Sequence, residues 1–280
     1  MEIVNILLNF VGLGLWVGAF VLPRYAVRSS RPLTLLSTLR SETPSGHERF
    51  LMVGFLIGLL GLRALGYWNF STPGALPPSV DFGVLSVSFR LDSLVHMLTY
   101  SVSSFVVFIY LYHLWALGLS FTCRHGGRID SIENLVNQQL GGVAFWHPGW
   151  KVLLSVVGGV GLWIVARSIL IVIEALPRDW SFFVIVTQSA VVVASLWLSF
   201  LIVVIVVLFL HLLHSYVYLG EQAIWVFTDR IAKVYLLPFR RLPLLLGRFD
   251  FAPIFGILVF WFLYRLGDWG IRAVLKHLSG

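Results

Sequence analysis

Long uninterrupted runs of apolar residues alternate along this chain with shorter stretches rich in Arg, Pro and Gly. The runs are solid rather than alternating, which is typical of membrane-spanning helices and not of barrel strands. We therefore predict an all-α, polytopic helical membrane protein with about six transmembrane helices. The expected spans are 5–22, 50–68, 93–121, 152–175, 182–219 and 251–266, with the last one extended to Trp269.

Two of these spans need an interpretation of their own. Residues 5–22 resemble a signal peptide in length, but the start is acidic (Glu2) and no small-x-small cleavage site follows, so we expect a retained helix. Residues 182–219 contain no Gly, Pro or charge, and one helix of that length would be about 55 Å long, against a hydrocarbon core of about 30 Å. We expect one long tilted helix. The alternative is two elements with a break near Ser195–Ser199.

The composition supports an integral membrane protein, because only 12% of the residues are charged and 58% are hydrophobic. Cys123 is the single cysteine, which excludes an internal disulfide and a cysteine-based metal site. The formal net charge is +7. In a membrane protein such an excess reports topology and contact with anionic lipid, and we expect no nucleic-acid partner.

One segment near the C-terminus combines a basic amphipathic stretch, a Pro/Gly-rich turn and an apolar span. Thr228-Asp229 is followed by Leu237-Pro238-Phe239-Arg240-Arg241, and then by Pro243, Gly247, Asp250 and Pro253. This pattern, within 224–266, resembles the signature of the YggT family, small membrane proteins of bacteria and plastids. The chain departs from the family pattern at Arg230, where Pro is usual, at Ala252, where Ser is usual, and in a longer gap before Pro238.

The resemblance implies a repeated unit of helix, surface segment and helix. It also implies a non-enzymatic role, since plastid relatives are linked to maturation of a haem-containing cytochrome complex and bacterial ones to envelope organisation and osmotic tolerance. On this basis we expect a two-helix hairpin with an extracytoplasmic loop at 1–92, a first repeat unit at 93–181 and a second at 182–280. Basic amphipathic segments would lie between the spans, including a surface helix at 131–140.

The evidence for duplication within the chain is mixed. The helix around His113 resembles the helix around His211, and Arg90-Leu-Asp resembles Arg248-Phe-Asp, but the two offsets differ. We expect an internal duplication. The alternative is that the helices are alike only because all such apolar helices are.

The signature segment supplies the first set of candidate site residues, for contact with lipid and partners. Its arginines would lie at the level of the lipid phosphates, Asp250 would accept hydrogen bonds from the first amides of the last helix, and Pro253 would occupy its first turn. The set comprises Arg230, Lys233, Pro238, Arg240, Arg241, Pro243, Gly247, Asp250 and Pro253.

A second set consists of polar residues inside spans: His113, His211, His214, Arg167 and Glu174. One b-type haem between His113 and His211, or at His214, is conceivable, but we expect no cofactor and no metal, with the histidines in contacts across helices or near the membrane boundary. Arg167 and Glu174 are seven residues apart and would share a face as a structural charge pair, or alternatively line an ion path. Arg63 is placed near the end of its span, where its side chain can reach the membrane boundary.

No nucleotide-binding, metalloprotease or serine-hydrolase motif appears in the sequence, so we expect no enzyme. The first interpretation is an accessory or assembly protein of a larger complex in the bacterial inner membrane, in contact with other membrane subunits and anionic lipids. The alternatives are a small channel or osmoprotective transporter, and an intramembrane haem or chlorin carrier.

The distribution of Lys and Arg predicts the topology. Loops 23–49, 122–151 and 221–250 hold five, three and five such residues, whereas 69–92, 176–181 and the tail after Tyr264 hold one, one and three. By the positive-inside rule the first group is cytoplasmic and both termini are extracytoplasmic. A C-terminal alkaline phosphatase fusion should therefore be active and a C-terminal fluorescent fusion dark. The opposite pattern would mean an odd number of spans.

Overall fold

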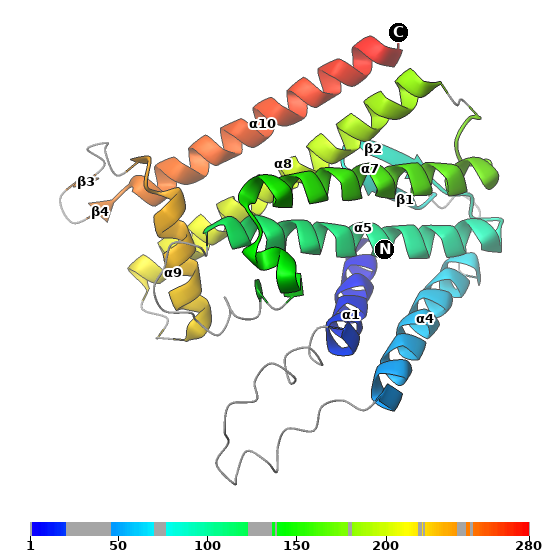
Figure 1. Cartoon of the computed structure of the whole chain (residues 1–280), viewed down its shortest axis with the longest axis horizontal. Helices are drawn as coiled ribbons and strands as arrows, with labels where there is room; N and C mark the ends of the chain where they lie inside the picture. Colours follow the sequence, from blue (N-terminus) through cyan, green and yellow to red (C-terminus); the bar gives the residue numbers. More distant parts are fainter. Residues whose placement is uncertain are drawn as a thin grey trace. The chain divides into compact units, whose positions relative to one another are not determined.

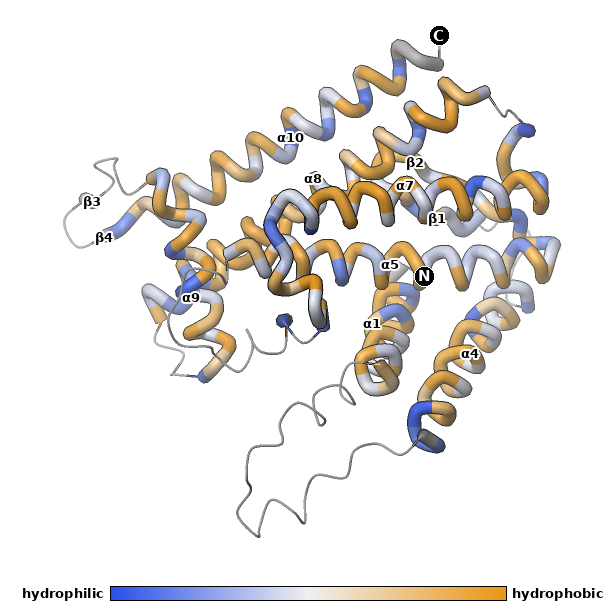
Figure 2. The backbone as a smooth tube through the Cα atoms, viewed as in Figure 1, coloured by the Kyte–Doolittle hydropathy of each residue, from blue (hydrophilic) through white to orange (hydrophobic). Residues whose placement is uncertain are grey.

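Six long helices dominate the structure, which confirms the expected all-α, multi-pass architecture (Figure 1). The computed structural model describes residues 2–20, 46–69, 77–122, 136–137, 139–178, 181–217, 220, 222–239, 245–246 and 249–279, and the account below concerns those residues. The long helices are α1 (Glu2–Phe20), α4 (Gly46–Asn69), α5 (Leu94–Thr122), α7 (Pro148–Val172), α8 (Phe182–Tyr216) and α10 (Ala252–Ser279). Hydrophobic residues occupy most of their length (Figure 2).

Helix α8 is continuous over 35 residues, which confirms the single long helix expected for 182–219. The serines at the suspected break do not interrupt it, because their hydroxyls bond within the helix. Ser195 Oγ donates to the carbonyl oxygen of Val192 at 2.9 Å, and Ser199 Oγ donates to that of Leu196 at 2.5 Å. The hydroxyls are thus satisfied without drawing backbone groups out of the helical ladder.

Two helices have boundaries that differ from the expected ones. Helix α10 continues to Ser279, about three turns beyond the apolar run. Two side chains four residues apart stabilise its polar end as a helix. Arg272 Nε donates a hydrogen bond to Asp268 Oδ2 at 3.0 Å. Helix α7 begins at Pro148, so that Lys151, counted above with a loop, lies in its first turns and is 1% exposed.

The remaining elements are short. They are the strands β1 (Ser79–Phe82) and β2 (Leu85–Ser88), the 3-10 turn η2 (Gly141–Phe145), the helix α9 (Ala223–Tyr235) and the strands β3 (Leu245–Leu246) and β4 (Phe249–Asp250). The surface helix expected at 131–140 lies largely outside the described residues.

The sheet β1–β2 falls where we expected only an extracytoplasmic loop. Its turn contains Gly83 at a φ of 77°, and a Cβ there would lie 1.8 Å from Ser195 Oγ, so both the backbone angle and the space demand glycine. Phe82 and Phe89 are each 1% exposed. The alternation of Val80 and Phe82 with polar residues was the signal for this strand.

The described chain divides into two compact units, which we treat separately. Unit 1 comprises Met1–Asp81, Ser86–Tyr110 and Ala166–Arg178, and unit 2 comprises Phe82–Leu85, Leu111–Val165 and Asp179–Gly280. The expected domain limits at 92 and 181 and the internal duplication stay predictions.

In unit 1, α1 packs against α4 and against the first half of α5. The contact between α1 and α5 is close at Gly12, where a Cβ would lie 2.7 Å from the ring of Phe105. Phe10 and Phe108 meet edge to face, with ring centroids 5.2 Å apart. Glycine on one helix therefore makes room for an aromatic side chain on the other, as is common in membrane helix pairs.

In unit 2, α8 packs against both α9 and α10. A buried cluster joins the three helices, consisting of Val204, Leu208, Ala232, Leu236 and Ala252. Indole and hydroxyl groups add polar contacts to α8, because Trp115 Nε1 of α5 donates to Ser199 Oγ at 3.1 Å and Trp197 Nε1 donates to Ser155 Oγ of α7 at 3.1 Å.

Candidate functional site

The most unusual side chain of unit 1 is Arg63 of α4, which is only 5% exposed. Its Nη1 donates to Asn9 Oδ1 of α1 at 2.8 Å, and its Nη2 donates to Ser104 Oγ of α5 at 3.0 Å. The guanidinium carbon also lies 5.1 Å from the centre of the Tyr100 ring, a cation–π distance. One cation thus contacts both of the neighbouring helices.

A second level of hydrogen bonds joins the same three helices. Asn5 Nδ2 donates to the hydroxyl of Tyr100 at 2.6 Å, and the hydroxyl of Tyr67 donates to Asn5 Oδ1 at 2.5 Å. Each helix supplies one residue to each level, and the two residues are four apart in the chain. We call the six residues the polar ladder: Asn5 and Asn9, Arg63 and Tyr67, Tyr100 and Ser104.

The pairing pattern fixes the directions of the helices in unit 1. The lower-numbered residue of α1, Asn5, meets the higher-numbered residue of α4, Tyr67, so these two helices are antiparallel. Asn5 meets the lower-numbered residue of α5, Tyr100, so α1 and α5 run parallel. These are the directions required of three successive membrane crossings.

The partners of Arg63 are all neutral. No carboxylate pairs with the guanidinium among the side chains that the structure describes, and Arg63 donates its hydrogen bonds to an amide oxygen and a hydroxyl oxygen. Its Nε is buried and makes no hydrogen bond within the described residues. A guanidinium carries five N–H donors and stays charged, so this site retains both a positive charge and free donor capacity.

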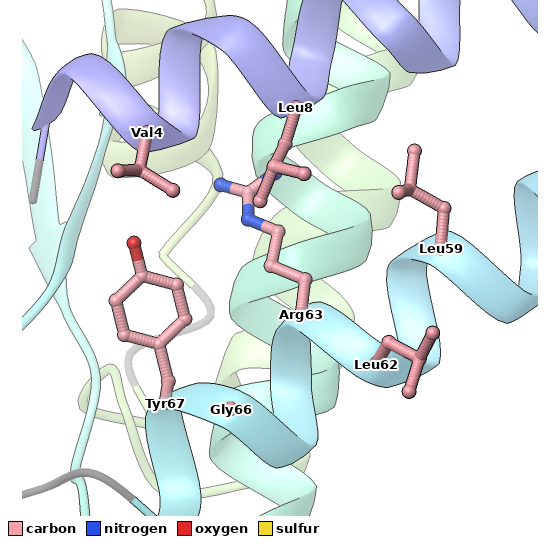
Figure 3. Close-up of a pocket in the computed structure, with 7 residues that line it drawn as sticks. All are labelled: Val4, Leu8, Leu59, Leu62, Arg63, Gly66 and Tyr67. Carbon is pink, nitrogen blue, oxygen red and sulfur yellow. The ribbon is translucent and has the colours of Figure 1, made fainter.

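A groove lies beside the polar ladder, between α1 and α4 (Figure 3). Its volume is about 490 Å³, within the range of ligand-binding cavities. It is lined by Val4, Leu8, Leu59, Leu62, Arg63, Gly66 and Tyr67. In Figure 3 the Arg63 guanidinium lies between the two α1 residues, and the Tyr67 hydroxyl points toward Val4.

The sequence interpretation directed the Arg63 side chain outward to the membrane boundary, whereas in the structure it is buried among the helices of unit 1. The side chain turns inward because Asn9 and Ser104 offer hydrogen bonds inside the helix bundle. A signal for this arrangement exists in the sequence, since each of three apolar spans carries two polar residues four apart. Such a pair places both side chains on one helical face.

In unit 2, His211 of α8 faces Asp229 of α9. His211 Nδ1 lies 3.1 Å from Asp229 Oδ1, and the other carboxylate oxygen pairs with Lys233 one turn along α9. Asp229 is part of the signature segment, and Lys233 is one of its expected cations. His211 therefore lies against a carboxylate of the neighbouring helix.

The other two histidines lie against aromatic rings. His214 stacks on Trp225 of α9 with centroids 5.6 Å apart and an interplanar angle of 7°. His113 contacts the adjacent Tyr112 edge to face at 5.2 Å. His211 and His214 both turn toward α9, so they serve the packing of that helix on α8.

Arg167 and Glu174 were expected to share one helical face, and the structure gives them different backbone settings. Helix α7 ends at Val172, and Glu174 lies in the turn beyond it at a φ of 61°. The helical spacing therefore does not extend to Glu174. Arg167 remains inside α7 and is 3% exposed.

The described part of the signature segment positions the last span. Asp250 Oδ1 accepts a hydrogen bond from the amide of Ala252, the first residue of α10, at 2.8 Å. This is one of the amides that a helix start leaves unsatisfied, and Pro253, next in the helix, has none to satisfy. Arg230 lies in α9, and Pro238 lies in the turn after it. Arg240, Arg241, Pro243 and Gly247 are outside the described residues.

The similar tripeptide before α5 behaves differently. Arg90 Nη2 donates to Asp92 Oδ2 at 2.8 Å. The hydrogen bond from the Arg90 guanidinium lowers the pKa of the Asp92 carboxyl, and the hydrogen bond to the Asp92 carboxylate raises the pKa of the Arg90 guanidinium. Both side chains are mostly exposed, so the pair adds little stability.

Comparison of the chain with protein-family models, curated proteins and solved structures gives no match. The likeness to the YggT signature therefore remains a resemblance of motif.

The hydrogen bond between Asp250 and Ala252 leads to a test by substitution. Asp250→Ala should lower the free energy of unfolding in detergent by about 0.5–2 kcal/mol, the range for loss of a helix-start acceptor. Asp250→Asn should cost much less, because an amide oxygen also accepts. Asp92→Ala is the matched control and should change the unfolding free energy by only a few tenths of a kcal/mol. Equal losses for Asp250→Ala and Asp92→Ala would contradict the assigned role.

Proposed function

We propose that this chain is a non-enzymatic accessory or assembly protein of a larger membrane complex in the bacterial inner membrane, with both termini on the extracytoplasmic side. Its partners on this proposal are other membrane-protein subunits and anionic lipids. The resemblance to the YggT signature supports the class, and the loop charges support the orientation.

One observation supports a protein partner in particular: the position of Trp261 in α10. Helix α10 packs against α8, yet Trp261 is 54% exposed near the middle of the candidate span Ala252–Lys276. Tryptophan in membrane helices concentrates at the water boundary, where its indole N–H finds acceptors. In the middle of the hydrocarbon a partner helix supplies such an acceptor, whereas a lipid tail does not.

The neighbouring side chains make the same face broad and aromatic. Phe262 is 60% exposed and Leu258 is 57% exposed. Aromatic residues are enriched where proteins meet one another. This surface of α10 is therefore the proposed contact with a partner subunit.

Helix α9 supports the contact with anionic lipids. It buries Thr228, Ile231 and Ala232, whereas the side chain of Lys233 is 55% exposed. A helix with one apolar face and exposed cations suits the membrane–water boundary, where each Lys or Arg adds about 1 kcal/mol of attraction to an anionic surface.

Photo-crosslinking in native membranes tests the partner contact. A benzophenone amino acid at position 261 should give one protein adduct of discrete mass, because the partner helix lies against that face. The same probe at Trp269, which is 70% exposed and eight residues further along α10, is the control for exposure and should give a much weaker adduct. Lipid adducts alone at position 261 would contradict the proposal.

A further inference from the structure

The groove of unit 1 combines apolar walls with one uncompensated cation. Five of its seven lining residues are Val, Leu or Gly, and the other two are Arg63 and Tyr67. Two of the five N–H donors of Arg63 are used, by Asn9 and Ser104, and its Nε makes no hydrogen bond within the described residues. A ligand that suits both features carries an apolar chain and an anionic group.

The groove also lies at one end of the helix pair. Val4 is two residues from the start of α1, and Tyr67 is two residues from the end of α4. Arg63 lies six residues, or about 9 Å, from that end of α4. Where the end of α4 marks the membrane surface, Arg63 lies near the level at which head groups meet acyl chains, so a lipid phosphate can reach it while the acyl chain follows α4.

We propose that the groove between α1 and α4 is a binding site for an anionic phospholipid. The phosphate accepts hydrogen bonds from the free donors of Arg63, and Tyr67 closes the site on the side of the head group. One acyl chain lies along the groove against Leu8, Leu59 and Leu62. The site is separate from the basic segment around α9 and does not depend on the proposed partner of α10.

The chemistry of the polar ladder favours an anion over a cation. Around Arg63 stand the amide groups and hydroxyls of Asn9 and Ser104, and no described carboxylate pairs with the guanidinium. An uncompensated cation in the membrane is costly, and an anion with two or more hydrogen bonds to it removes that cost. A bound phosphate therefore stabilises a charge that has no carboxylate partner among the described residues.

Filling the groove is the first test. A Cβ at Gly66 meets nothing within 4 Å and Gly66 lines the groove, so Gly66→Leu is expected to place a side chain there. Gly58→Leu is the matched control, because Gly58 lies on the same helix, also has nothing within 4 Å and does not line the groove. Leu62→Trp, at a groove residue that is 70% exposed, is a second blocking variant should Gly66→Leu fail to fold.

The second test neutralises the charge of Arg63 with a carboxylate that the protein itself supplies. Asn9 already accepts a hydrogen bond from Arg63, so Asn9→Asp puts a carboxylate against the guanidinium at 2.8 Å without a large change in shape. The variant keeps the helix contact and supplies the missing negative charge. It should therefore remove the preference for an anionic lipid while the protein stays folded.

The measurement is native mass spectrometry of the full-length protein in detergent, titrated with phosphatidylglycerol or phosphatidylcholine of identical acyl chains. Wild type and Gly58→Leu should bind the first phosphatidylglycerol at least about fivefold more tightly than phosphatidylcholine. Gly66→Leu and Leu62→Trp should lose the tight site, and Asn9→Asp should bind both lipids alike.

Retention of the preference for phosphatidylglycerol in Gly66→Leu or Asn9→Asp overturns the proposal. So does binding of inorganic phosphate as tightly as phosphatidylglycerol, which would show that the acyl chain and the groove contribute nothing.

Discussion

The charge of Arg63 is the constraint on which unit 1 depends. A guanidinium does not lose its proton in a protein, and a charged side chain within a membrane helix is costly unless it has polar partners. The chain meets this cost with hydrogen-bond acceptors from two other helices, at Asn9 and Ser104. Because those contacts exist only at one depth and one rotation of each helix, they specify the register of α1, α4 and α5, which apolar packing alone leaves free to slide.

Unit 2 is held together by a different kind of interaction. There, small and branched side chains of α8, α9 and α10 pack in one cluster around Leu208 and Ala232. The few polar contacts lie at the edges, where Asp229 meets His211 and Asp250 holds the first amide of α10. The amphipathic helix α9 is thereby fixed to α8, and α10 begins at a defined residue. Much of the apolar surface of α10 is left outward-facing for lipid or a partner.

The sequence predicted the helices well and the polar contacts between them poorly. Long apolar runs specify a span through composition alone, so even the single long helix at Phe182–Tyr216 followed from the absence of Gly, Pro and charge. The role of Asp250 at the start of α10 could also be predicted from the sequence, because capping involves only residues that are neighbours in the chain. The ladder around Arg63 depends on three segments far apart in the chain, and nothing in one segment shows which residues of another it meets. Glu174 was misplaced because the end of α7 at Val172 has no Gly or Pro to mark it.

A double-mutant cycle between Arg63 and Asn9 tests the account most directly, by unfolding in detergent. Asn9→Ala alone leaves a buried guanidinium short of an acceptor and should cost about 1–3 kcal/mol. In the background of Arg63→Met, which replaces the charge by an apolar chain, the same Asn9→Ala change should cost much less, giving a coupling of about 0.5 kcal/mol or more. Equal costs in the two backgrounds would show that Arg63 and Asn9 do not interact and would contradict the polar ladder.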